Sequence, residues 1–373
     1  MAPFHIDIPR EQLTDLRERL VRTRWPDELP GVGWDLGVAR HHLQALVLYW
    51  IDDYDWRFHE ARLNALPQWT TVIDGQLLHF VHITAPDADA PALLLLHGWP
   101  GTFADFRPVI DELAAEFHLV IPSLPGFGFS GPTAEAGWDP PRMARAFAEL
   151  MRRLGYERYG VQGGDFGSII AADVGRADPD RVQGVHLNAL ANASMPVDPR
   201  QAEALTPEER EQIEANRKWW QGHNGYAMQM GTRPQTIAYA LTDSPAGQLA
   251  WYLEWFVGHD PDHTTQSPVD PDAILTDTTI LWFTNTAGSA ARLYREAGPA
   301  SFGTVGEVSG VPTAVAKFRE DRAVRGLAAQ EHRLVRWTEI DAGGHFAALQ
   351  APHDLAEDVK EFFHSLQHSG GDS

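Results

Sequence analysis

Short apolar runs alternate with amphipathic stretches along most of the chain after residue 69. The run 92–96 is apolar at every position, which is typical of a parallel strand that is buried on both faces. Further strand-like runs occur at 71–73, 77–81, 117–121, 159–162, 182–187, 313–318 and 335–340. Because helical patterns separate most of these runs, the sequence predicts a doubly wound, mostly parallel α/β sheet.

Local signals indicate where several of these elements begin or turn. The dipeptide Asp74-Gly75 lies between the first two strand-like runs and predicts a tight hairpin, because both residues tolerate positive φ angles. Asp139 is expected to cap a helix, with proline in its first turn. Thr206 and Glu209 form the capping-box pattern at the start of another helix.

The opening region, residues 1–68, has a different pattern. Leu13, Leu16 and Leu20 form one apolar stripe of a first helix, and a second helix is expected over 43–51. No strand pattern precedes the second helix. We therefore expect this region to be a helical meander outside the main sheet.

The strand pattern also stops after about residue 195, and only helical patterns follow until about residue 299. Asp277 is expected to cap one of these helices. Helices without intervening strands predict a cap inserted into the sheet domain. The expected parts are an amino-terminal meander over 1–68, a first core segment over 69–195, a helical cap over 196–299 and a second core segment over 300–373.

The composition excludes several classes of protein. The chain has 43% hydrophobic and 22% charged residues, which is ordinary for a globular protein, and it has no cysteine, so disulfides and thiolate metal sites are excluded. A net charge of −21 disfavours nucleic acid and anionic membranes as partners. No basic region followed by an apolar core opens the chain, and no apolar run approaches about 18 residues. We expect a cytoplasmic enzyme that binds no membrane.

The candidate chemistry centres on Asp165, which lies between Gly163 and Gly167. A strand-like run precedes this turn and a buried helix follows it, which is the layout of the nucleophile elbow of α/β-hydrolases. That elbow usually carries a serine, and here a carboxylate takes its place. A carboxylate that attacks a saturated carbon forms an ester that water can cleave, whereas a serine would form an inert ether. The turn therefore predicts displacement at an sp3 carbon, either epoxide opening or dehalogenation.

An acid and a histidine should follow the nucleophile in the chain. His345 lies in a glycine-led loop after the last strand-like run and is the candidate histidine. The candidate acid is Glu320 or Asp321, which follow the run 313–318, and Asp341 is a weaker third candidate. The acid would hold the imidazole and stabilise its protonated form.

The loop 97–101 follows the buried run 92–96 and should lie beside the nucleophile. The backbone N–H groups of Trp99 and Phe166 are expected to form the oxyanion hole. The spelling G-x-G-x-x-G at 126–131 is followed by prolines that would interrupt a dinucleotide-binding helix, so no nicotinamide site is predicted. The chain has no HExxH motif, and we predict no metal and no cofactor.

Taken in order, three motifs resemble those of the microsomal-type epoxide hydrolases, an α/β-hydrolase family: HGWPG at 97–101, GGDFGS at 163–168 and GGHFA at 343–347. The resemblance covers nearly the whole chain, including the meander. Because no amino-terminal membrane anchor is evident, we expect a soluble, bacterial-like member. It implies an acid three positions after Phe318, which is Asp321. The proline usual in that loop is Arg319 here, so Glu320 is kept as the fallback.

The resemblance also implies the other site residues and the reaction. Tyr226 and Tyr294 would donate hydrogen bonds to the epoxide oxygen while Asp165 attacks a ring carbon. His345 would then activate a water that hydrolyses the aspartyl ester, which gives a vicinal diol. The implied substrate is an apolar or aryl epoxide, and the possibility of a homodimer is left open.

Two other functions are kept as alternatives. A haloalkane dehalogenase also uses an aspartate elbow, but it commonly has a tryptophan N–H beside the nucleophile, which Phe166 cannot supply. A non-catalytic ligand-binding protein on a hydrolase fold usually lacks one triad member, and none is missing here. Several aromatic residues of the cap either line a large apolar pocket or pack helices together: Trp219, Trp220, Trp251, Trp255, Phe256 and Trp282.

Overall fold

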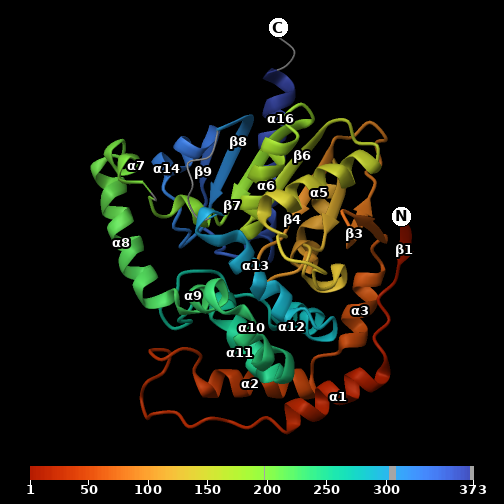
Figure 1. Cartoon of the computed structure of the whole chain (residues 1–373), viewed down its shortest axis with the longest axis vertical. Coiled ribbons are helices and arrows are strands. Elements are labelled where there is room, and N and C mark those ends of the chain that lie inside the picture. Colours follow the sequence, from red (N-terminus) through yellow and green to blue (C-terminus); the bar gives the residue numbers. More distant parts are fainter. Residues whose placement is uncertain (197, 302–307, 370–373) are drawn as a thin grey trace.

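Within the described residues, nine strands form one sheet in the order β1-β2-β3-β5-β4-β6-β7-β8-β9 (Figure 1). The structure is a computed structural model, and it describes residues 1–196, 198–301 and 308–369. The strands are β1 Ala2–Phe4, β2 Gln68–Ile73, β3 Gln76–Ile83, β4 Ala92–Leu96, β5 His118–Pro122, β6 Tyr159–Gly164, β7 Val182–Asn188, β8 Ser309–Lys317 and β9 His332–Glu339.

The sheet is antiparallel at one edge and parallel through its centre. β1, β2, β3 and β5 pair antiparallel, whereas β5, β4, β6, β7, β8 and β9 pair parallel. The predicted hairpin is confirmed, since Ile73 pairs with Gln76 and both Asp74 and Gly75 have positive φ angles. The mostly parallel α/β sheet predicted from the alternating pattern is also confirmed.

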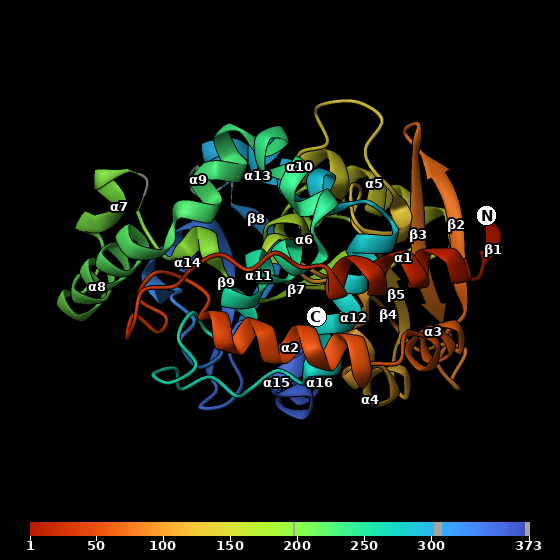
Figure 2. The ribbon, with the colours of Figure 1, turned by 90° about the horizontal axis from the view of Figure 1, so that it is seen from below.

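The sheet is covered by helices on both faces, which explains why β4 is apolar at every position. Leu94 and Leu96 belong to a core cluster that includes Phe147 of α5 and Ile170 of α6. Leu93 and Leu95 belong to a second cluster that includes residues of α4 and α16. Figure 2 shows α5 on one side of the strands and α4 and α16 on the other.

The helices of the core are α4 Ile110–Ala114, α5 Pro140–Arg153, α6 Phe166–Ala177, α14 Arg325–Glu331, α15 Ala347–Gln350 and α16 Pro352–Ser369, with 3-10 turns η1 Phe103–Val109, η2 Gly128–Ser130 and η3 Ala191–Ala193. Asp139 caps α5 as predicted, because its side chain accepts from the N–H of Arg142. Between β7 and β8 the chain forms α7 Pro199–Glu203, α8 Pro207–His223, α9 Gly225–Thr232, α10 Pro234–Asp243, α11 Pro245–Phe256, α12 Pro271–Phe283 and α13 Ala287–Ser301.

The amino-terminal helices pack on these inserted helices, on the side away from the sheet (Figure 1). They are α1 Arg10–Val21, α2 Arg40–Asp52 and α3 Trp56–Asn64. α1 and α2 both contact α11, and α3 contacts α12. The inserted helices are thus held between the carboxyl edge of the sheet and the amino-terminal segment.

Two sequence predictions are wrong. The opening region is not wholly outside the sheet, because Ala2–Phe4 forms β1 and pairs antiparallel with β2. Three residues are too few to show a strand period, and their pairing depends on a partner far along the chain. Asp277 does not cap a helix. Asp270 caps α12 through the N–H of Asp272, and Asp277 lies inside that helix with 1% of its surface exposed.

Candidate active site

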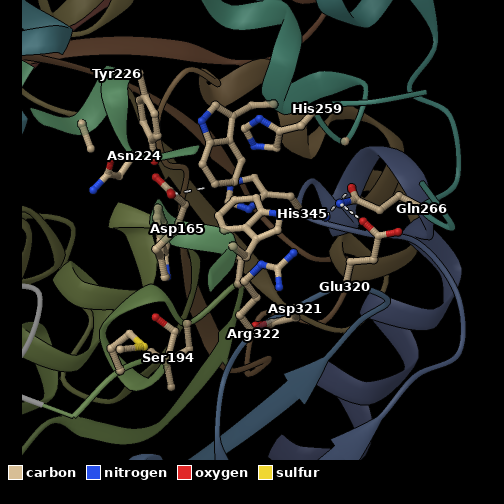
Figure 3. Close-up of a pocket in the computed structure, with 18 of the residues that line it drawn as sticks. Asp165, Ser194, Asn224, Tyr226, His259, Gln266, Glu320, Asp321, Arg322 and His345 are labelled. Atoms are coloured by element: carbon tan, nitrogen blue, oxygen red, sulfur yellow. Dashed lines mark hydrogen bonds and ion pairs between the residues drawn. The ribbon is translucent and has the colours of Figure 1, made fainter. Parts of the chain in front are cut away.

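Four loops at the carboxyl edge of the sheet and two helices above it supply the candidate residues. Trp99 follows β4, Asp165 follows β6, Asp321 follows β8 and His345 follows β9. Parallel strands bring such loops together at one edge. A cavity of about 290 Å³ lies over this edge (Figure 3). It is lined by the five residues predicted to be catalytic: Asp165, Tyr226, Tyr294, Asp321 and His345.

The turn that carries Asp165 requires glycine on both sides. Asp165 itself has a φ of +54°, a conformation that is rare for residues with a side chain. A Cβ atom at Gly163 would lie 2.1 Å from the carbonyl oxygen of Gly167, and one at Gly167 would lie 2.0 Å from that of Leu96. The local sequence therefore permits a strand-to-helix turn too tight for other residues, and this turn places the carboxylate above the sheet.

The two oxygens of Asp165 have different surroundings. Oδ1 accepts a hydrogen bond of 2.8 Å from the backbone N–H of Trp99, and the N–H of Phe166 also favours the charged carboxylate. Oδ2 lies 3.6 Å from Nε2 of His345, which is too long for a hydrogen bond. Burial raises the pKa of Asp165 to about 6, and the two N–H donors oppose that rise.

His345 is positioned by groups that come from the inserted helices and the loops between them. Its ring centroid lies 4.5 Å from that of Trp255 on α11, and its backbone N–H donates to Oε1 of Gln266 over 3.2 Å. Burial lowers the pKa of His345 to about 4. The imidazole is therefore neutral near pH 7 and can accept a proton.

The three candidate acids lie in different environments. Asp321 lines the cavity, and its Oδ1 accepts from the N–H of Ala323 over 2.9 Å. Burial raises its pKa. Among the described residues, no direct hydrogen bond joins Asp321 to His345. Asp341 is almost fully exposed and forms an ion pair with Arg319 at 2.8 Å, so it is turned away from the site.

Glu320 also lines the cavity, but its carboxylate is held by the loop before α12. It accepts hydrogen bonds from the hydroxyl groups of Thr264 and Thr265, from the backbone N–H of Thr265 and from the amide of Gln266. Gln266 thus contacts both Glu320 and the backbone of His345. Glu320 ties the inserted segment to the core, and its oxygens are occupied.

The two tyrosines face each other above the nucleophile. Their ring centroids are 5.7 Å apart, and Tyr294 packs edge-on against Phe166 at 4.8 Å. The indole of Trp99 stacks on Tyr226 at 5.4 Å and meets Tyr294 edge-on at the same distance. Burial raises the pKa of both phenols well above the usual value of about 10, so both remain hydrogen-bond donors.

Sequence reasoning missed three features of this site. It assigned Trp99 only a backbone N–H, whereas the indole also supports both phenols. Trp255 was named only as a residue that lines a pocket or packs helices, without its contact to His345, and Gln266 was not assigned to the site. The abundance of tryptophan on α11 was the only signal for Trp255, and no pattern marks Gln266.

The structure shows neither a metal site nor a membrane-spanning helix in the part of the chain that it describes. Across residues 1–196, 198–301 and 308–369, no group of three or more histidine or acidic side chains is arranged to hold a metal ion. No helix in the same part of the chain combines the length and the apolar character needed to cross a membrane.

The sheet order, the aspartate elbow and the helices inserted after β7 define an α/β-hydrolase, and residues 91–352 match the family description "alpha/beta hydrolase fold". Residues 1–106 match a second description, "Epoxide hydrolase N terminus". The chain belongs to the epoxide hydrolase family and is an enzyme of that class, which confirms the resemblance inferred from its motifs.

Individual relatives agree with this assignment over nearly the full length. The chain is 32% identical to juvenile hormone epoxide hydrolase 2 of Ctenocephalides felis, with 96% of this chain and 84% of the relative aligned. It is 29% identical to epoxide hydrolase 1 of Sus scrofa, over 98% of this chain and 89% of the relative. The solved structure of Aspergillus niger epoxide hydrolase superposes with a TM-score of 0.86 at 32% identity, covering 98% and 96% of the two chains.

Proposed function

We propose that this enzyme opens an epoxide to a vicinal diol through a covalent ester of Asp165. The main observation in support of this proposal is that the two carboxylate oxygens of Asp165 have different surroundings. Oδ1 is held by the N–H of Trp99, whereas Oδ2 lies 3.6 Å from Nε2 of His345, and the carboxylate lines the cavity. A carboxylate with one fixed and one free oxygen is suited to nucleophilic attack.

In the first step, Oδ2 attacks a ring carbon of the epoxide. A new C–O bond forms, the C–O bond of the ring breaks, and the alkoxide takes a proton from Tyr226 or Tyr294. Both phenols are protonated near neutral pH and lie over the nucleophile. Donors placed where negative charge develops lower the barrier more than they stabilise the bound substrate.

In the second step, Nε2 of His345 removes a proton from a water molecule that attacks Cγ of the ester. The negative charge that develops on Oδ1 is held by the N–H of Trp99, which already donates to that oxygen, and by the N–H of Phe166, which also donates to this carboxylate. Asp321 stabilises the imidazolium that forms. Collapse of the intermediate breaks the bond between Cγ and Oδ2, and the imidazolium gives its proton to the departing alkoxide, which leaves as the diol. The new carboxyl group of Asp165 gives its proton to the phenolate formed in the first step, so both side chains are restored.

We further propose an apolar or aryl epoxide as the substrate. Large rings and small apolar side chains line much of the cavity, among them Trp219, Trp220, Trp255, Leu190 and Ala227. A concave apolar pocket with a few polar groups at its reactive end is the usual form of a small-molecule site. Dehalogenation is less well supported, because Phe166 has no indole N–H to hold a halide.

A single turnover with the His345→Ala variant tests this scheme. The variant should form the ester but fail to hydrolyse it, so intact mass spectrometry should show an adduct with the mass of the substrate. Asp165→Asn should form no adduct. His259→Ala is a matched control, since His259 also lines the cavity and packs on Trp255, and it should accumulate none. Absence of adduct in His345→Ala, despite loss of turnover, would refute the two-step scheme.

A further inference from the structure

One cationic side chain lines the active-site cavity without an anionic partner. Arg322 follows the candidate acid Asp321 and contributes to the wall of the same cavity (Figure 3). Within the described residues, no carboxylate oxygen lies within 4.0 Å of its guanidinium group, and that group donates no hydrogen bond. Its neighbour Arg319, by contrast, forms an exposed ion pair with Asp341. The N–H donors of the Arg322 guanidinium group are therefore not used in hydrogen bonds within the described part of the protein.

The position of Arg322 is fixed from both ends. Its backbone carbonyl accepts a hydrogen bond of 2.8 Å from Asn216 of α8. Its guanidinium carbon lies 3.9 Å from the centroid of the Trp219 ring. A guanidinium that stacks on an aromatic ring uses its flat face, which leaves the N–H groups at its edge free for acceptors in the plane. Trp219 thus positions the guanidinium group of Arg322, and the N–H donors of that group stay available.

The neighbouring carboxylates do not satisfy this charge. Glu320 is engaged by the threonines and the glutamine of residues 264–266. Asp321 accepts from the backbone of Ala323. Burial lowers the pKa of Arg322 from its usual value, and the nearby charges of Glu320 and Asp321 oppose that fall without forming an ion pair within 4.0 Å. Holding an unpaired charge in such a place costs stability, so a ligand that pairs with it would gain that energy on binding.

Aromatic rings connect two polar parts of the cavity wall. The reactive end holds Asp165, the tyrosines and His345, and the Trp255 ring packs on His345 at 4.5 Å. Trp255 in turn meets Trp219 at 6.2 Å, and the guanidinium group of Arg322 packs on the Trp219 ring. A substrate with an epoxide at one end, an apolar middle and an anion at the other end matches this sequence of groups.

We propose that Arg322 determines specificity for epoxides that carry a carboxylate, which its free N–H edge would bind in a bidentate pair. The inference rests on the proposed function, because it names the substrate class of the same site. A carboxylate is planar and singly charged, and it matches the fork of donors on a guanidinium. The pairing also offsets the repulsion that such a substrate would meet from the ionised nucleophile, Asp165.

Matched pairs of epoxides test the proposal. One pair is para-carboxystyrene oxide and its para-carboxamide, and a longer, flexible pair is an ω-epoxyundecanoate and its primary amide. The amide has nearly the same shape but no charge. For at least one pair, kcat/KM of the wild-type enzyme should favour the acid by roughly tenfold to a hundredfold, the range expected for hydrogen bonds to a charged group.

Variants separate recognition from folding. Arg322→Met should abolish the preference for the acid, measured as the ratio of kcat/KM for the acid to that for the amide, mainly through a higher KM for the acid. Arg322→Lys keeps the charge but loses the fork, so it should restore part of the preference. Arg319→Met is the matched control, because Arg319 pairs with Asp341 outside the cavity, and it should retain the full preference.

Two results would overturn the proposal. One is a wild-type enzyme that converts styrene oxide but favours neither acid over its amide. The other is a preference for the acid that persists in Arg322→Met. Failure to convert styrene oxide, both acids and both amides would instead refute the proposed epoxide hydrolysis, so the two failures are distinguishable.

Discussion

The backbone N–H of Trp99 donates to Oδ1 of Asp165 over 2.8 Å, while the indole of the same residue stacks on Tyr226. One residue thus orients the nucleophile through its backbone and a proposed acid through its side chain. The close approach depends on Gly98, since a Cβ atom there would lie 2.4 Å from Oδ1 of Asp165. The relative position of carboxylate and phenol is therefore set by the core before any substrate enters.

The phenols should matter through their hydroxyl groups. We expect Tyr226→Phe and Tyr294→Phe each to slow ester formation by roughly 10- to 1000-fold, because each removes one donor to the developing alkoxide. Tyr252→Phe is the matched control. Tyr252 is buried and also packs edge-on against Trp99, at 5.6 Å, but it does not line the cavity. Stopped-flow measurement of the first step should show little change in this control. Equal losses in all three variants would indicate a packing effect.

The pH dependence of ester formation should follow Asp165. Its carboxylate must be ionised to attack, and burial raises its pKa to about 6. The rate should therefore fall as pH falls through about 6. The low pKa of His345, about 4, keeps the imidazole neutral across that range. The raised pKa values of both tyrosines predict no loss of rate at alkaline pH below about 10. A rate that falls only near pH 4, or one that falls between pH 8 and 9, would contradict these assignments.

The triad acid can be identified by comparing neighbours. Asp321→Asn should slow ester hydrolysis by roughly 100- to 10,000-fold and allow the ester to accumulate, because the imidazolium loses its stabilising charge. Glu320→Gln should mainly loosen the loop of residues 264–266, with an effect of about tenfold or less and no accumulation. Rapid-quench mass spectrometry of both variants measures the ester. Accumulation in Glu320→Gln alone would reverse the assignment.

A buried carboxyl pair should stabilise the contact between the inserted helices and the core. Asp277 of α12 accepts from the hydroxyl of Thr102 over 2.5 Å and is adjacent to Asp105 of η1. Burial raises the pKa of both carboxyl groups, so the pair retains a proton that can bridge them. Asp277→Ala leaves Thr102 and Asp105 without this partner and should lower the free energy of unfolding by about 1–3 kcal/mol.

Urea denaturation measures this effect. Asp111→Ala is the control, because the Asp111 side chain is 89% exposed and its ion pair with Arg107 is long, at 3.9 Å. It should change the free energy of unfolding by less than about 0.5 kcal/mol. An unchanged urea midpoint for Asp277→Ala would contradict the proposal that this pair stabilises the contact.

Much of the fold follows from patterns that are local in sequence. The apolar run of β4, the Asp74-Gly75 turn and the Asp139 cap each depend on a few adjacent residues, and all three were predicted. β1 was missed because its pairing with β2 joins residues more than 60 positions apart. Asp277 was misplaced because a carboxylate before an apolar stretch has the pattern of a cap, whereas its partners come from elsewhere in the fold.

The features of the site also divide into those that local sequence predicts and those that depend on the folded structure. The elbow is encoded within a few residues, since only glycine fits at Gly163 and Gly167. The choice between Glu320 and Asp321 could not be made from spacing alone, because it depends on which carboxylate the loop of residues 264–266 engages. Arg322 has no pattern of its own. Its unpaired state is a property of the folded cavity. The cytoplasmic location, the oligomeric state and the limits of the four chain segments stay predictions.

The central claim is that Asp165 forms a covalent ester whose carbonyl carbon is attacked by water, and isotope labelling tests it most directly. A single turnover in H₂¹⁸O with enzyme in excess should place the label in the carboxylate of Asp165 and leave the first diol unlabelled, because the diol oxygen comes from Oδ2. Peptide mass spectrometry locates the label. Label found in the first diol, with none in Asp165, would show direct attack of water on the epoxide and would contradict the proposed mechanism.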